Sequence, residues 1–113
     1  MEKEELYNEA WRLWGGDTQL DILIEEMAEL TQAIIKTRRH NMTWSYAVLE
    51  EIADVSICLE QVETRLKGRS CDINRKTMLP TRYLFDIVEE IKERKLTRLE
   101  ERICAEKGEL QKR

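Results

Sequence analysis

The sequence of 113 residues contains few of the residues that interrupt helices, with four glycines and one proline. Aromatic residues are also scarce, at 6%. Folds built from many short strands need turns rich in glycine and proline, so this composition excludes an all-β architecture. Charged residues at 37% and hydrophobic residues at 42% favour helices instead. We therefore expect one all-α domain over residues 1–113, because this length suits a single core.

Histidine and paired cysteines are also lacking. The sequence has one histidine, His40, and three widely spaced cysteines, Cys58, Cys71 and Cys104. An odd number of cysteines without a Cys-x-x-Cys pair argues against a disulfide framework and against a zinc site. A single histidine argues against a His-based catalytic triad.

Long apolar runs and an excess of positive charge are absent as well. The longest apolar stretches fall far short of the ~20 residues that a membrane span needs, and residues 1–5 do not resemble a signal peptide. We therefore expect a cytoplasmic protein with no membrane partner. The formal net charge of −4 has the wrong sign for neutralising nucleic-acid phosphates, so we expect no duplex nucleic-acid partner.

The spacing of apolar residues predicts four helices. They cover residues 2–14, 18–39, 43–67 and 81–112, and Thr43 is a candidate cap for the third. The connection between the second and third helices is so short that we expect an antiparallel hairpin over about residues 18–67. We expect this hairpin to complete a four-helix-type bundle through association, as a homodimer or homotetramer, because the helices carry more apolar surface than one small chain can cover.

The most informative residues are acidic side chains on the two helices of the expected hairpin. Glu26 with Glu29, and Glu51 with Asp54, are pairs three residues apart, so each pair shares one helix face. Surface carboxylates on helices commonly have a lysine or arginine three or four residues further on, but neither pair does. These carboxylates are also next in sequence to apolar residues that line one face of each helix. We therefore expect the carboxylates to lie at the edge of the core.

Four carboxylates brought together between two helices would repel one another unless a cation neutralised them. Oxygen ligands without nearby histidine or cysteine favour Mg²⁺, or Mn²⁺, over Zn²⁺. Magnesium sites commonly keep open positions for substrate phosphates, so we expect a polyphosphate substrate.

The acidic residues also carry a resemblance. Glu25-Glu26-Met27-Ala28-Glu29, followed after 21 residues by Glu51-Ile52-Ala53-Asp54, resembles the EExxE…ExxD signature of the MazG-like, all-α nucleoside triphosphate pyrophosphohydrolase superfamily. The similarity covers about residues 11–66. It implies Mg²⁺-dependent hydrolysis of a (deoxy)nucleoside triphosphate to the monophosphate and pyrophosphate. The implied metal ligands are Glu26, Glu29, Glu51 and Asp54, with Glu25 and Glu50 as supporting residues or additional ligands.

Polar and aromatic residues near the acidic pairs are candidate substrate contacts. Gln19 and Lys36 follow the face of the first acidic pair, where Gln19 would contact a base or sugar and Lys36 a phosphate; the alternative is that each is a plain surface residue. Lys95, Arg98 and Arg102 share one face of the last helix and would contact phosphates, although a salt-bridged surface explains them equally well.

Tryptophans near the helix ends have two interpretations. One of Trp11, Trp14 and Trp44 would stack on a nucleobase, or all three pack in the core or between subunits.

A second function for the whole chain also fits the pattern: a non-catalytic helical dimerisation or regulatory module, in which the acidic residues form a docking surface for a basic partner. The sequence leaves open the base and sugar preference and the identity of the general base.

Overall fold

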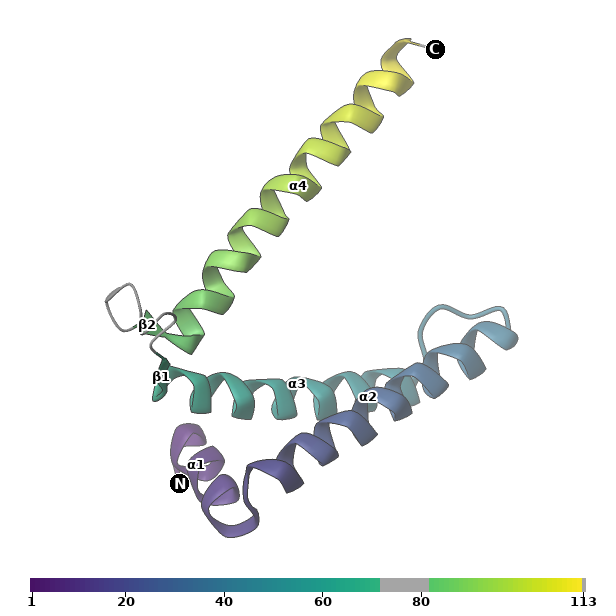
Figure 1. The fold of residues 1–113 in the computed structure, drawn as a ribbon. Helices are drawn as coiled ribbons and strands as arrows, with labels where there is room; N and C mark the ends of the chain where they lie inside the picture. The colour runs from purple at the N-terminus through teal and green to yellow at the C-terminus, as the bar shows by residue number, and fades with distance from the viewer. Residues whose placement is uncertain (72–81, 113) are drawn as a thin grey trace. The chain divides into compact units, whose positions relative to one another are not determined.

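The structure is a computed structural model that describes residues 1–71 and 82–112. The described part is built of four helices and one small pair of strands (Figure 1). The elements are α1 (Lys3–Trp14), α2 (Gly16–Arg39), α3 (Tyr46–Lys67), β1 (Ser70–Cys71), β2 (Arg82–Tyr83) and α4 (Leu84–Lys112). The chain divides into two compact units, Met1–Arg65 and Leu66–Arg113. The all-α class is confirmed, and the single domain over residues 1–113 stays a prediction.

In the first unit, α2 and α3 form the predicted antiparallel hairpin. The Gln19 amide nitrogen donates a 2.6 Å hydrogen bond to the Gln61 side chain, near the start of α2 and the end of α3. At the opposite end, the hydroxyls of Thr37 and Ser45 lie 2.7 Å apart in a shared hydrogen bond. Because both hydrogen bonds join α2 to α3 or to the residue before it, they set the register of the two helices.

The connection between α2 and α3 is longer than the sequence predicts. Helix α3 begins at Tyr46, and the Ser45 hydroxyl accepts a 3.2 Å hydrogen bond from the Val48 amide, as an N-cap does. The prediction that Thr43 caps this helix is therefore wrong. Asn41 makes the turn in the left-handed conformation, with φ of 58°.

Helix α1 packs on the end of the hairpin through polar and aromatic contacts. The buried Tyr7 hydroxyl donates a 2.5 Å hydrogen bond to Glu60, and the Lys3 ammonium lies 3.2 Å from the same carboxylate. Arg65 lies over the Trp11 ring, 5.7 Å from its centroid. These contacts join α1 to the last turns of α3, at the open end of the hairpin.

A tight junction joins α1 to α2. Gly15 caps α1 with φ of 83° and ψ of 159°, a conformation that favours glycine. At Gly16, an added Cβ would lie 2.8 Å from the Trp11 ring. Helix α2 begins at Gly16, two residues before the predicted start, with no side-chain cap.

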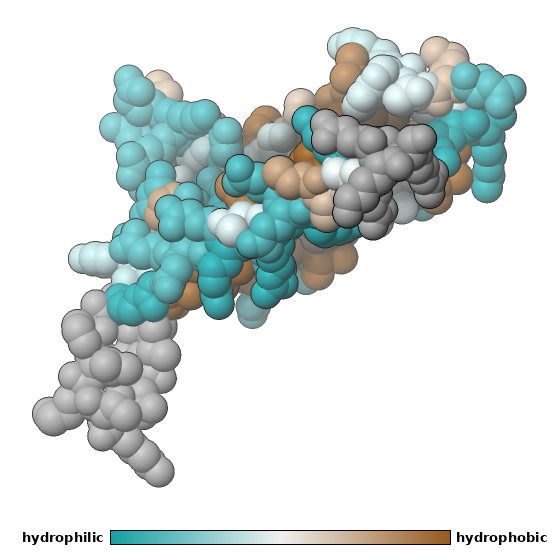
Figure 2. All heavy atoms as spheres, turned by 90° about the horizontal axis from the view of Figure 1, so that it is seen from above, coloured by the Kyte–Doolittle hydropathy of each residue, from teal (hydrophilic) through white to brown (hydrophobic). Residues whose placement is uncertain are grey.

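Apolar side chains are only partly covered within the chain. Among the residues whose burial the structure describes, the buried hydrophobic ones are Tyr7, Val48 and Val55. On α2, the apolar residues Leu20, Ile24 and Met27 keep 42%, 60% and 42% of their surface exposed. Figure 2 shows apolar side chains (brown) at the surface between hydrophilic ones (teal).

The second unit consists of α4 and the strand pair before it. Ser70 pairs with Tyr83 and Cys71 with Arg82 in an antiparallel register. The segment predicted to start a helix near residue 81 therefore forms a strand at residues 82–83, and helix α4 begins at Leu84. Residue 81 lies outside the described residues. None of the helices in the described part combines the length and apolar character that a membrane span requires.

Candidate metal centre

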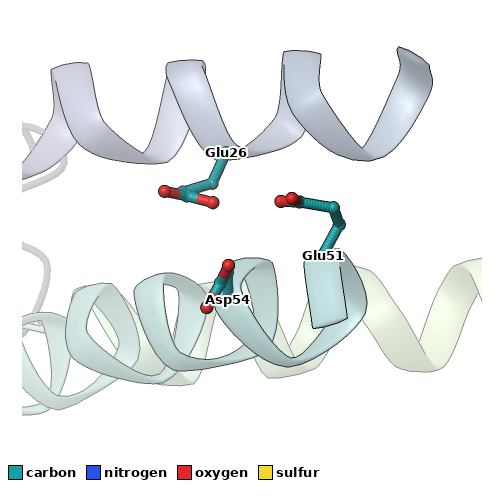
Figure 3. Close-up of side chains that lie close together, drawn as sticks. All are labelled: Glu26, Glu51 and Asp54. Carbon is teal, nitrogen blue, oxygen red and sulfur yellow. The ribbon is translucent and has the colours of Figure 1, made fainter. Parts of the chain in front are cut away.

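Three of the predicted ligands converge between α2 and α3. Glu26 on α2 and Glu51 and Asp54 on α3 each offer a carboxylate oxygen, and these oxygens all lie within 4.8 Å of one another. Figure 3 shows the side chains of Glu26, Glu51 and Asp54 extending into the space between the two helices. Since Glu51 and Asp54 are three residues apart, one turn of α3 presents both to the same space.

Burial and neighbouring negative charges raise the pKa of two carboxyls of the cluster, Glu26 and Glu51. Burial raises the pKa of Glu26 to about 7, with further contributions from the charges of Glu29, Asp54 and Glu51. Burial also raises the pKa of Glu51, followed by the charges of Glu29 and Asp54. The cluster thus carries more negative charge than its surroundings stabilise.

Two oxygens of the cluster have no hydrogen-bond partner among the residues that the structure describes. Glu26 Oε2 and Glu51 Oε2 are buried and have no hydrogen-bond partner. Ion pairs in the described residues involve other carboxylates, those of Glu9, Glu60, Glu89 and Glu90. Buried carboxylate oxygens normally have a hydrogen-bond partner or a bound cation, so a ligand would supply the partner that these two oxygens lack.

The residues present fit a hard divalent cation. The three side chains supply only carboxylate oxygens, the ligands that Mg²⁺ and Mn²⁺ prefer. Glu26, Glu51 and Asp54 would hold such an ion. Two or three carboxylates leave room in an octahedral shell for water and substrate oxygens.

The other predicted acidic residues lie outside this group. Glu29 is exposed, and its charge nevertheless contributes to the raised pKa values of Glu26 and Glu51. Glu25 and Glu50 are exposed neighbours in sequence of the clustered residues. The structure therefore brings three of the four predicted ligands together and places Glu29 beside them.

The predicted substrate contacts are dispersed over both units. Gln19 is 7% exposed, and its amide nitrogen is engaged with Gln61, while its Oε1 is buried without a partner. Lys36 is exposed on α2. The remaining three, which are exposed on α4 in the second unit, are Lys95, Arg98 and Arg102. Their roles as substrate contacts stay predictions.

The sequence reasoning missed two residues of α3, Cys58 and Gln61. Cys58 lies one turn after Asp54, and burial together with the charges of Glu26 and Asp54 raises the pKa of its thiol. Gln61 holds Gln19 across the hairpin. A single cysteine or glutamine in a helix gives no sequence signal, because its proximity depends on the register of α2 and α3.

Comparison with known proteins adds no relative. No family model, no curated protein and no solved structure matches the chain.

Proposed function

We propose that the chain is a Mg²⁺-dependent hydrolase that cleaves a (deoxy)nucleoside triphosphate to the nucleoside monophosphate and pyrophosphate. The observation that carries the proposal is the group formed by Glu26, Glu51 and Asp54, whose oxygens lie within 4.8 Å of one another. The unpartnered buried oxygens of Glu26 and Glu51 support it. The resemblance to the MazG-like superfamily supplies the reaction, and Mn²⁺ is the alternative ion.

The chemistry needs charge neutralisation and a proton acceptor. A divalent ion held by these residues would offset the charge of the triphosphate and make a water a better nucleophile. The water oxygen forms a bond to phosphorus, the bond from that phosphorus to the bridging anhydride oxygen breaks, and pyrophosphate leaves. A carboxylate of the cluster accepts the proton of the water. Glu26, Glu51 and Asp54 would thus both hold the ion and place a base beside the reacting atoms.

A panel of canonical and damaged (d)NTPs, with pyrophosphate release as the readout, tests this proposal. We expect Mg²⁺-dependent release from at least one nucleotide. Glu51→Gln and Asp54→Asn should each lower the rate on the order of a hundredfold or more, because each removes a ligand. The matched control is Asp21→Asn, which removes an exposed charge from α2 away from the cluster.

Two outcomes would overturn the proposal. One is the absence of pyrophosphate release from every nucleotide in the panel by folded protein. The other is equal rates for the wild-type chain and both cluster variants. Absence of turnover would instead favour the non-catalytic module, in which a basic partner neutralises the carboxylates.

We also propose that the chain works as a homodimer or homotetramer. Large apolar side chains remain exposed on each of its long helices, including Ile24 at 60%, Leu49 at 54% and Leu96 at 63%. Monomers rarely leave so many such residues in water, and symmetric association is the common solution.

A further inference from the structure

A cavity of about 490 Å³ lies at the closed end of the α2–α3 hairpin. It is bounded by the last turns of α2, the connection to α3 and the first turns of α3. Its volume is within the range of ~300–1,000 Å³ typical of small-molecule sites. The function proposed above names a metal cluster and leaves this cavity without a role.

The cavity continues the seam that holds the carboxylates. Leu30 lines it on α2, four residues after Glu26, and Val48 lines it on α3, three residues before Glu51. Residues three or four apart share one helix face. The cavity therefore begins about one turn, roughly 5 Å, from the cluster on the same face of each helix.

The lining combines an aromatic surface with hydrogen-bonding groups. Trp44 lines the cavity and is 63% exposed, so its indole face is free to be covered. Arg38, Asn41 and Thr43 add donors and acceptors to the same lining. The ion pairs found among the described residues leave Arg38 uncommitted. The lining thus supplies both groups that an aromatic base needs: a ring to stack on and polar groups for its edge.

The connection that carries these groups is held in place by hydrogen bonds. The amides of Asn41 and Met42 donate to the carbonyls of Arg38 and Thr37 at 3.0 Å and 3.2 Å. Ser45 shares its hydroxyl hydrogen bond with the buried Thr37. A fixed connection means that binding costs little ordering of the protein.

We propose that this cavity binds the nucleoside half of the triphosphate, with Trp44 stacked on the base, while the phosphates lie at the carboxylate cluster. This inference rests on the proposed function and deepens it by assigning the base and sugar to the closed end of the hairpin. It replaces the base or sugar contact predicted for Gln19, which lies at the opposite end of the hairpin. Base selection is then determined by Trp44, Arg38 and Asn41.

Fluorine NMR of the full chain labelled with 5-fluorotryptophan tests the assignment directly. The chain has three tryptophans, and Trp44→Phe identifies the resonance of Trp44. The probes are the common ribo- and deoxyribonucleosides and their monophosphates, added without Mg²⁺ at millimolar concentration. We expect at least one to shift the Trp44 resonance saturably and to leave Trp14 unchanged.

Variants then measure the contribution of the ring. Trp44→Ala should weaken nucleoside binding between about fivefold and a hundredfold, the range for loss of one stacking contact. It should raise KM for the triphosphate by a similar factor, with kcat and Mg²⁺ affinity nearly unchanged. Trp44→Phe should recover part of the loss. The control is Trp14→Ala, since Trp14 is similarly exposed, at 61%, and lies outside this cavity.

The outcomes separate this inference from the proposed function. Turnover with an unchanged KM in Trp44→Ala, or no shift of Trp44 with any probe, would overturn the assignment of the cavity. A Trp44 resonance that responds to protein concentration instead of nucleoside would also overturn it, in favour of a second copy of the chain. Saturable binding without pyrophosphate release would support the cavity and contradict the hydrolase.

Discussion

At the scale of single residues, the Glu26 carboxyl couples the cluster to pH. Its pKa of about 7 means that the folded chain holds a proton that the unfolded chain releases near pH 4.5. A raised carboxyl pKa contributes stability at low pH, and this contribution is lost as pH rises through about 7. The repulsion among the carboxylates of the cluster is therefore greatest at the pH at which they are best able to hold a cation.

We predict that, with divalent ions removed, the Tm of the chain falls between about pH 5 and pH 8. Glu26→Gln should flatten this dependence and raise the Tm at pH 8, because the amide carries no charge to desolvate. Thermal unfolding followed by circular dichroism at several pH values measures the effect. Asp21→Asn serves as the control and should keep the wild-type slope. Parallel curves for the wild-type chain and Glu26→Gln would contradict the role of Glu26.

Tyr7 is a second residue whose environment makes a prediction. Its hydrogen bond to Glu60, together with burial, raises its pKa to about 12. Tyr7→Phe should destabilise the chain by about 1 kcal/mol, since it removes one hydrogen bond to a charged group that is partly exposed. Urea unfolding measures this change. Tyr46→Phe is the matched control, because Tyr46 is 76% exposed; equal effects of the two substitutions would show that the Glu60 contact adds no stability.

At the scale of elements, the junction between α1 and α2 depends on the backbone of Gly15. Gly15→Ala should destabilise the chain by about 1–3 kcal/mol, because φ of 83° with ψ of 159° is strained for any residue with a Cβ. No atom lies within 4 Å of the added Cβ, so the cost would come from the backbone alone. Gly108→Ala within α4 is the opposite control and should stabilise its helix by up to about 1 kcal/mol. Similar unfolding curves for both variants would contradict this account.

The helices and strands also show which parts of the fold can be predicted from the sequence alone. Apolar spacing predicts the helices well, because each long helix repeats its signal over many turns. The predicted start of α3 was wrong because Thr43 and Ser45 are both residue types that cap helices. The choice of Ser45 depends on its hydrogen bond to Thr37 across the hairpin. The pairing of β1 with β2 was missed because two-residue strands carry no periodicity.

The acidic residues of the candidate site could also be predicted from the sequence, whereas their surroundings could not. The spacing of Glu26, Glu51 and Asp54 and the lack of nearby bases indicated their convergence, and the structure brings their oxygens together. The positions of Cys58 and Gln61 could not be inferred, since they follow from the register between helices. The cavity at the hairpin end likewise depends on how the connection folds.

At the scale of the whole molecule, the exposed apolar stripe of α2 makes a prediction about association. Light scattering coupled to size-exclusion chromatography should give a mass two or four times the 13.5 kDa of the chain. Ile24→Lys should shift the population toward smaller species, because Ile24 lies in the middle of the exposed stripe with Leu20 and Met27. Thr18→Lys, at an exposed polar position near the start of the same helix, is the control. A monomer at all micromolar concentrations would contradict the proposal.

Cation binding by the cluster is the claim on which the proposed function depends. Mn²⁺ binding to metal-free protein, followed by the loss of the free-ion signal in electron paramagnetic resonance at about pH 8, tests it most directly. We predict saturable binding that Mg²⁺ competes away, that Asp21→Asn keeps, and that Glu51→Gln and Asp54→Asn lose without unfolding. Absence of saturable binding at millimolar Mn²⁺, or equal binding by all four proteins, would contradict it.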